Sequence, residues 1–184
     1  MSTTSQPFGL RPVFSPSGVV RPTAYAIVTG YTSNILGNQP VKIGTGGNIE
    51  AAAIGDRFIG TFQGVEFTDT DGRRRVSNKW TASTSATEIV AYVTLDPTIV
   101  YEIQANATMT VANIGEQYDY TVITAGSTVV GLSQMMLDVA STATNASLRV
   151  IGLSPGPDNA WGDNFPIVEV QISEHQNVAD RIAY

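Results

Sequence analysis

Short apolar stretches separated by turn residues recur along the chain from Thr23 onward. In Val168, Val170 and Ile172, apolar side chains alternate with polar ones, and Ile99–Gln104 alternates in the same way. A period of two is typical of strands that bury one face. Eight segments rich in β-branched and aromatic residues are therefore predicted as strands: residues 23–29, 39–43, 59–67, 89–95, 99–104, 118–124, 148–153 and 167–174.

Glycine, proline, asparagine and aspartate cluster between these segments, as in GTGGN (44–48), DTDG (69–72) and SPGPDN (154–159). Such clusters indicate tight turns. Sustained helical periodicity is absent from the sequence, and only Val111–Gln117 and Ser133–Leu137 have the composition of a helical turn. The pattern predicts an all-β fold, a single antiparallel β-sandwich or barrel over residues 23–174, with a C-terminal tail at 175–184.

Residues 1–22 differ from the rest of the chain because they contain four prolines, at positions 7, 12, 16 and 22. Proline fixes φ and disfavours helix at the preceding residue, so this segment is predicted to be extended. Phe8, Leu10 and Phe14 are isolated apolar residues within it. Two interpretations are open: a frayed terminus, or an N-terminal arm that places these side chains in pockets of a neighbouring subunit.

The composition of the chain favours a protein as binding partner over a nucleic acid. Charged residues make up 14% of the chain, against about 25% in a typical soluble domain, and the net charge is −6. A weakly charged surface suits packing against another protein, although a free protein can have the same composition. Ten Lys and Arg residues spread over 184 do not form the basic clusters that nucleic-acid binding requires.

The sequence predicts no disulfide, no thiolate metal site, no membrane span and no secretory signal. Cysteine is absent, which excludes disulfides and thiolate metal sites. No apolar run reaches the length of a membrane span, and the first residues lack the charged and apolar regions of a secretory signal. We therefore expect synthesis in a cytoplasm and no membrane or nucleic-acid partner.

The strongest catalytic pattern is Gly152–Gly156, which fits the G-x-S-x-G nucleophile elbow of hydrolases. An elbow needs the backbone N–H after the serine for the oxyanion hole, and Pro155 has none. Pro157 then continues a turn where a helix should begin. A strand-ending loop is expected instead. His175, the only histidine, is expected to be exposed after the last strand rather than to act as a base or metal ligand.

Asp69–Gly72 begins like a calcium loop, but Arg74 occupies the position that requires glycine. A hairpin tip with a small basic patch is predicted there, either solvated or facing an acidic surface. Gly44–Asn48 lacks the phosphate-loop pattern and indicates a turn. Trp80 is expected in the core and Trp161 in a surface loop. With no catalytic, cofactor-binding or metal-ligating residues, the chain is not predicted to be an enzyme, and its candidate residues are protein contacts: Phe8, Leu10, Arg11, Phe14, Arg73, Arg74, Arg75 and Trp161.

Seven segments, in order along the chain, resemble a family of structural proteins of tailed-bacteriophage virions, of the head cement or decoration type. The similarity runs from about Gln6 to His175 and lies in QPFGLRPV (6–13), NQPVKI (38–43), GTFQGVEFTDTDG (60–72), NKWTAST (78–84), AYVTLDPTIVYEIQ (91–104), LRVIGLSPGPDN (148–159) and VEVQISEH (168–175).

The resemblance implies a jelly-roll-like domain that acts as a homodimer or homotrimer on the outside of the virion capsid, after synthesis in the host cytoplasm. Its partner would be the major capsid protein, whose neighbouring subunits it clamps, and it would need no cofactor. Two alternatives stay open. One is another virion role, in a tail, adaptor or fibre. The other is a carbohydrate-binding β-sandwich in which Trp161 and Tyr31 or Tyr118 stack on sugars.

Overall fold

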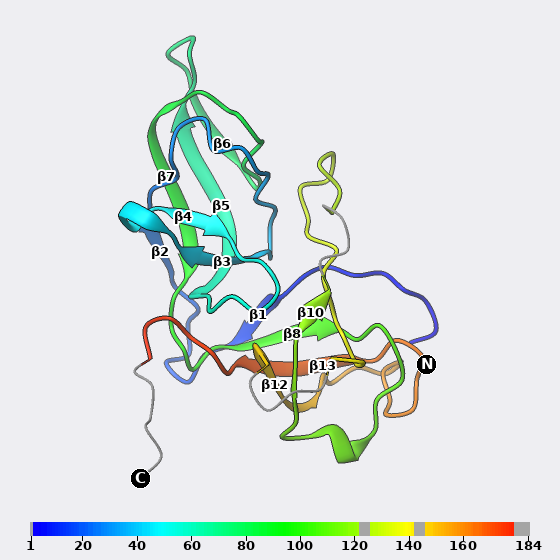
Figure 1. Cartoon of the computed structure of the whole chain (residues 1–184). Coiled ribbons are helices and arrows are strands. Elements are labelled where there is room, and N and C mark those ends of the chain that lie inside the picture. Colours follow the sequence, from blue (N-terminus) through cyan, green and yellow to red (C-terminus); the bar gives the residue numbers. More distant parts are fainter. Residues whose placement is uncertain (1, 122–125, 142–145, 179–184) are drawn as a thin grey trace.

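The computed structural model describes residues 2–121, 126–141 and 146–178. Two antiparallel sheets packed together make up nearly all of the regular structure, which confirms the all-β prediction (Figure 1). The upper sheet of Figure 1 has the order β2 (Pro22–Tyr25), β7 (Thr87–Thr94), β5 (Gly60–Thr68), β3 (Pro40–Ile43) and β4 (Ile49–Ala51), and β6 (Arg74–Ser77) also pairs with β5. The lower sheet has the order β1 (Arg11–Phe14), β8 (Val100–Gln104), β13 (Ile167–Ile172), β12 (Leu148–Leu153) and β9 (Gln117–Tyr118).

The smaller elements are a two-stranded ladder and two 3-10 turns. β10 (Tyr120–Thr121) pairs with β11 (Met136–Leu137). β11 lies within Ser133–Leu137, whose composition is that of a helical turn, but it is a strand. The turn η1 (Thr45–Gly47) connects β3 to β4, which confirms the turn expected in GTGGN. The turn η2 (Val111–Asn113) lies within Val111–Gln117, the other segment with the composition of a helical turn.

The hairpin of β5 and β6 follows the prediction for Asp69–Gly72. The carboxylate of Asp69 accepts hydrogen bonds from the backbone N–H groups of Asp71 and Arg73, at 3.0 and 2.9 Å. These bonds close the turn locally, as aspartate commonly does. The same backbone bond from Arg73, and then the guanidinium of Arg75, hold the pKa of Asp69 below its ordinary value. The carboxylate of Asp69 therefore forms the turn at the tip of this hairpin.

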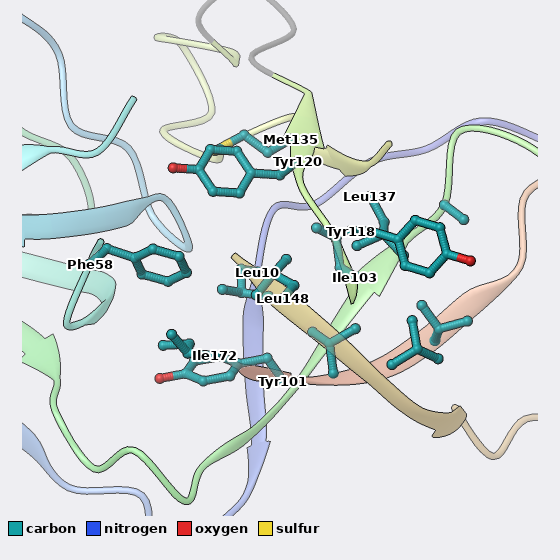
Figure 2. Packing of buried hydrophobic residues seen from close by; sticks show 14 of the residues in the cluster. Leu10, Phe58, Tyr101, Ile103, Tyr118, Tyr120, Met135, Leu137, Leu148 and Ile172 are labelled. Carbon is teal, nitrogen blue, oxygen red and sulfur yellow. The ribbon is translucent and has the colours of Figure 1, made fainter. Parts of the chain in front are cut away.

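Each sheet has its own hydrophobic cluster. The lower cluster contains Val168, Val170 and Ile172 of β13, as their alternation predicted, and the upper cluster contains Trp80. Phe58 belongs to the lower cluster, although it lies only two residues before β5 of the upper sheet. Figure 2 shows its ring facing that of Tyr120, with which it makes an edge-on contact at 5.9 Å between ring centroids. The loop before β5 thus joins the two halves.

A buried chain of hydroxyl groups crosses the same junction. Thr94 Oγ1, at the end of β7, accepts a hydrogen bond from the backbone N–H of Thr61 at 2.8 Å and lies 3.0 Å from the hydroxyl of Tyr101 in β8. Burial raises the pKa of Tyr101, so its hydroxyl stays protonated and can donate. These bonds satisfy polar groups that water does not reach, and they tie the end of one sheet to the other.

The first 22 residues are extended, as predicted, but they are part of the fold. Arg11–Phe14 forms β1, which pairs with β8, and Leu10 is completely buried in the lower cluster. The backbone N–H of Ser2 also donates to Asp163 at 2.7 Å. The expectation of a separate arm is therefore wrong for Leu10 and β1, because the chain's own sheet supplies their partners. The arrangement of the sheets does not establish a jelly-roll connectivity, which stays a prediction.

Candidate protein-interaction surface

The most apolar exposed part of the lower sheet is the region around its edge strand β1. Phe14 is 57% exposed, Val13 is 40% exposed, and Val19 is exposed just after the turn that follows β1. We call these three exposed residues, Val13, Phe14 and Val19, which are grouped by their closeness in sequence, the β1 edge patch. β1 stands at the end of the strand order, so one of its sides has no strand partner in the described residues. A large exposed aromatic beside an open sheet edge is typical of a protein contact.

Pro12 limits how another strand can pair with this edge. Proline has no N–H, and the register of β1 against β8 is irregular between Pro12 and Phe14. Both features discourage indiscriminate strand addition. The patch is therefore better suited to contact through the side chains of Phe14 and its neighbours than through a long backbone ladder.

Phe8 and Arg11 lie beside the patch, as a pair. The guanidinium of Arg11 stacks 4.6 Å from the centre of the Phe8 ring, and its Nε donates to Glu102 of β8 at 3.2 Å. Ser154 Oγ donates to the other oxygen of Glu102 at 2.6 Å. Glu102 thereby balances the charge of Arg11. Ser154, the serine of the G-x-S-x-G pattern, directly follows β12 and binds the carboxylate of Glu102. The strand-ending loop predicted there is confirmed.

The arginines of the basic patch lie elsewhere, at the far end of the upper sheet (Figure 1). All three are exposed, but Arg74 pairs with Glu66 at 3.1 Å and Arg75 with Asp69 at 2.7 Å. Tyr92 donates to the same Glu66, and this bond holds the pKa of that carboxyl below its ordinary value. The hairpin therefore presents a mixed-charge surface, and the structure does not bring it together with the β1 edge patch.

The aromatic residues considered for sugar stacking are not grouped on one surface. Tyr118 is completely buried, and its hydroxyl accepts a hydrogen bond from Asn113 at 2.7 Å. It cannot stack on a ligand, which corrects that expectation. Trp161 is half-buried and packs against the lower cluster. Tyr31 is half-buried against the upper cluster, and its hydroxyl accepts from the backbone N–H of Ala51.

Sequence reasoning missed a second exposed apolar feature, the loop Ser127–Leu132, which we call the valine hairpin. Val129 is 91% exposed and Val130 is 58% exposed. Ser127 and Leu132 form a β-bridge at its base. The signal in the sequence is a pair of valines enclosed between Gly126 and Gly131, outside any strand pattern. The hairpin stands beside the upper sheet in Figure 1, where it is the yellow loop.

His175 is buried, at 3% exposure, where exposure had been predicted. The strand β13 is followed by a segment that returns to the upper sheet, where His175 bridges to Phe58 and Gln176 bonds to Ile43. The Nδ1 atom of His175 accepts the N–H of Asn177 at 3.1 Å, whereas Nε2 has no hydrogen-bond partner among the described residues. Burial holds its pKa below the ordinary value of 6.5. His175 is therefore buried at this junction, whereas the next three residues are exposed, and residues 179–184 of the predicted tail lie outside the described residues.

We expect stability to fall between about pH 7 and about pH 5 because of His175. The unfolded chain takes up a proton as pH falls through 6.5, but the folded chain resists it, because burial disfavours the charged imidazole. Protonation of Nδ1 would also break the hydrogen bond that it accepts from the N–H of Asn177. The stabilisation is therefore present above that pH and is lost toward the lower folded pKa. Urea unfolding at both pH values measures it. His175→Asn keeps an acceptor without titrating and should lose much of this dependence; an equal dependence in the variant contradicts the assignment.

Comparison with known proteins adds no relative. No family model matches the chain, and neither the curated proteins nor the solved structures contain a match. In the described residues, no helix is long and apolar enough to span a membrane. The same residues contain no group of three or more histidine, aspartate or glutamate side chains placed to hold a metal ion. The β1 edge patch and the valine hairpin are two of the exposed apolar surfaces in the described part of the chain.

Proposed function

We propose that this chain is a capsid cement, or decoration, protein of a tailed bacteriophage, which binds the outer surface of the head and clamps neighbouring major capsid subunits. The observation that supports this proposal most is the β1 edge patch, with Phe14 largely exposed on an open edge of an all-β fold. The ordered resemblance of seven segments to such virion proteins supports it independently. The role is mechanical and involves no catalytic step.

The physical basis of the clamp is burial of apolar surface without burial of free charge. Phe14 is 57% exposed, so covering the rest of its side chain contributes about 1–2 kcal/mol relative to leaving it in water. Arg11, two residues from Val13 in sequence, is already paired with Glu102, so docking does not strand its charge. Arg21, two residues from Val19, is an exposed charge that the shell would have to leave in solvent or pair with an acidic group. A single such contact is weak. Many copies on one shell, each bridging two subunits, act together through avidity.

The proposal is tested by co-sedimentation of the purified protein with expanded, undecorated heads of the phage that encodes it. A cement protein should bind saturably, at a fixed ratio to the major capsid protein. Binding confined to the portal vertex or tail instead would indicate another virion role. Absence of binding to any virion part, with binding to a glycan array, would favour the carbohydrate alternative.

Phe14→Asp should weaken binding to the shell at least about tenfold, because it removes the largest apolar contact of the patch and adds a charge. The fold should be unaffected, since Phe14 is largely exposed. Val111→Asp is the matched control, because Val111 is similarly exposed but lies in η2, outside the patch. Co-sedimentation isotherms of the two variants make the comparison. Equal affinities would show that the β1 edge patch is not the shell contact.

A further inference from the structure

The upper sheet nearly closes on itself, because a hydrogen bond joins its two end strands. The strands at the ends of its order are β2 and β4 (Figure 1). The backbone N–H of Ile49, the first residue of β4, donates at 2.8 Å to the carbonyl of Ala26, which directly follows β2. The mouth of a closed or nearly closed sheet is a common position for a ligand site.

An open recess of about 470 Å³ lies at the end of this sheet where β2 and β4 finish. Its walls come from the segment between β2 and β3, from the end of β4 and the residues after it, and from Ala82, which lies between β6 and β7. The volume falls within the range of about 300–1,000 Å³ that is typical of small-molecule sites. Four alanines line the recess, Ala51–Ala53 and Ala82, and we call it the alanine recess.

Hydrogen bonds hold the alanine wall of the recess in place. The backbone N–H of Ala51 donates to the hydroxyl of Tyr31 at 3.1 Å. The carbonyl of Ala53 accepts a bond from the hydroxyl of Tyr120, a residue of the lower cluster, at 2.8 Å. A site whose walls are already ordered loses little conformational freedom when it takes up a ligand.

Three side chains of the recess use their oxygen atoms to bind the chain's own backbone. The amide oxygen of Asn34 accepts the N–H of Ala82 at 2.8 Å, and that of Gln39 accepts the N–H of Leu36 at 2.9 Å. The hydroxyl oxygen of Tyr31 accepts a backbone N–H in the same way. Each amide keeps two N–H donors, and the phenol keeps one O–H donor. These residues therefore offer mainly hydrogen-bond donors to a ligand.

None of the described residues that line the recess is charged. Asp56 accepts the N–H of Ala53 at 2.8 Å, but its carboxylate is neutralised by the ammonium of Lys42, 2.7 Å away. Glu50 lines a different depression, together with Lys42. An ionic ligand in the recess would lose water without meeting an opposite charge, so a neutral ligand is favoured.

Neutral saccharides combine the features that this site requires. Their ring and hydroxyl oxygens accept hydrogen bonds from amide and phenol donors, and the exposed hydroxyls of Thr32 and Ser33, which also line the recess, can donate or accept. The C–H faces of a sugar ring pack against an aromatic ring and small apolar side chains, which Tyr31 and the four alanines supply.

We propose that the alanine recess binds a neutral saccharide unit through Tyr31, Asn34 and Gln39. The arrangement differs from the stacking expected from the sequence, because it uses neither Tyr118 nor Trp161. It goes beyond the capsid role and does not depend on it, since no residue of the β1 edge patch lines the recess.

An array of neutral and acidic glycans, probed with the unmodified chain, tests the class of ligand. The chain should bind neutral glycans and should not bind acidic ones above background. Saturation-transfer NMR with the best-bound neutral sugar then measures its affinity, for which we expect a dissociation constant on the order of 1 mM. An array without a bound neutral glycan, or with acidic glycans bound more strongly, overturns the proposal.

An engineered cysteine tests the position of the sugar. The natural chain has no cysteine, so Ala53→Cys can be alkylated at one place. Ala53 is exposed at the recess, so the free thiol should leave the sugar affinity unchanged, whereas a bulky maleimide should lower it at least about tenfold by covering the recess. Ala112→Cys, exposed in η2, is the matched control and should keep its affinity after the same alkylation. Equal affinities of the two alkylated variants would overturn the assignment to the recess.

Phe14→Asp separates sugar binding from shell binding. The variant should lose affinity for the shell and keep its affinity for the sugar, because Phe14 does not line the recess. If a chain that fails to co-sediment with heads still binds neutral sugars at the recess, the cement role is wrong and the sugar site stands. If Phe14→Asp loses both activities, one surface serves both, and a separate sugar site is wrong.

Discussion

Phe58→Ala should lower the free energy of unfolding by about 3–5 kcal/mol, the cost of removing a fully buried phenylalanine. The side chain has no exposed surface and belongs to the lower cluster, although its backbone leads into β5 of the upper sheet. Its removal leaves a cavity beside Tyr120 and takes away the edge-on ring contact between the two halves. For a chain of this size, the loss corresponds to a melting temperature lower by roughly 10 °C.

Urea unfolding measures this loss, and Phe14→Ala is the matched control. Phe14 is the same residue type, but it is 57% exposed, so its truncation should cost less than about 1 kcal/mol. If both variants lose the same small amount, Phe58 does not join the two sheets in the way described.

Gly60→Ala should destabilise the chain by about 2–5 kcal/mol, the combined cost of overpacking and of disrupting buried hydrogen bonds. A Cβ atom at Gly60 would stand 1.8 Å from the carbonyl oxygen of Thr94 and 2.6 Å from its Oγ1. The first of these atoms is backbone and cannot turn aside. Thr94 would have to move, and its bonds to Thr61 and Tyr101 would break.

Thermal unfolding of Gly60→Ala and Gly72→Ala separates this clash from ordinary backbone strain. Gly72 has a left-handed φ of +77° but no atom within 4 Å of a built Cβ, so its substitution should cost only about 1–2 kcal/mol. Similar losses in the two variants would mean that β5 and β7 adjust freely at the junction.

Local pattern alone predicts the longer strands β5, β7, β8, β12 and β13, but it does not predict β1, β4, β6 or β11. The alternation at residues 167–174 correctly indicated β13, and the turn residues of DTDG indicated the β5–β6 hairpin, because both signals act over a few neighbouring residues. The division of the core into two clusters could not be found in this way. Phe58 and Ile59 are adjacent apolar residues, yet their side chains belong to different clusters.

In the N-terminal segment too, local pattern reveals the conformation of the chain but not the contacts it makes with residues far away in sequence. Its prolines correctly predicted an extended conformation, and Phe14 is exposed as a contact residue should be. The burial of Leu10 depends on β1 pairing with β8, about ninety residues away in sequence, which composition does not reveal. Deletion of residues 1–22 would therefore remove a strand and a core side chain, and only point variants such as Phe14→Asp test the surface.

The valine hairpin and His175 were missed or misplaced for a related reason. The sequence of the hairpin has neither a strand nor a helix period, so it gives no sign that a loop protrudes there. The protrusion is recognised only from the structure, in which backbone bonds to Gly37 hold the base of the loop. His175 follows the last strand, where chain ends are commonly exposed. Its burial results from the return of the chain to Phe58, a contact between segments more than a hundred residues apart.

The most direct test of the clamp is the temperature at which DNA in packaged, undecorated heads becomes accessible to a nuclease. Saturating amounts of the unmodified chain should raise that temperature, whereas Phe14→Asp at the same concentration should raise it much less. A head that binds the chain at a fixed ratio but releases its DNA at an unchanged temperature would contradict the proposal that this protein clamps the capsid.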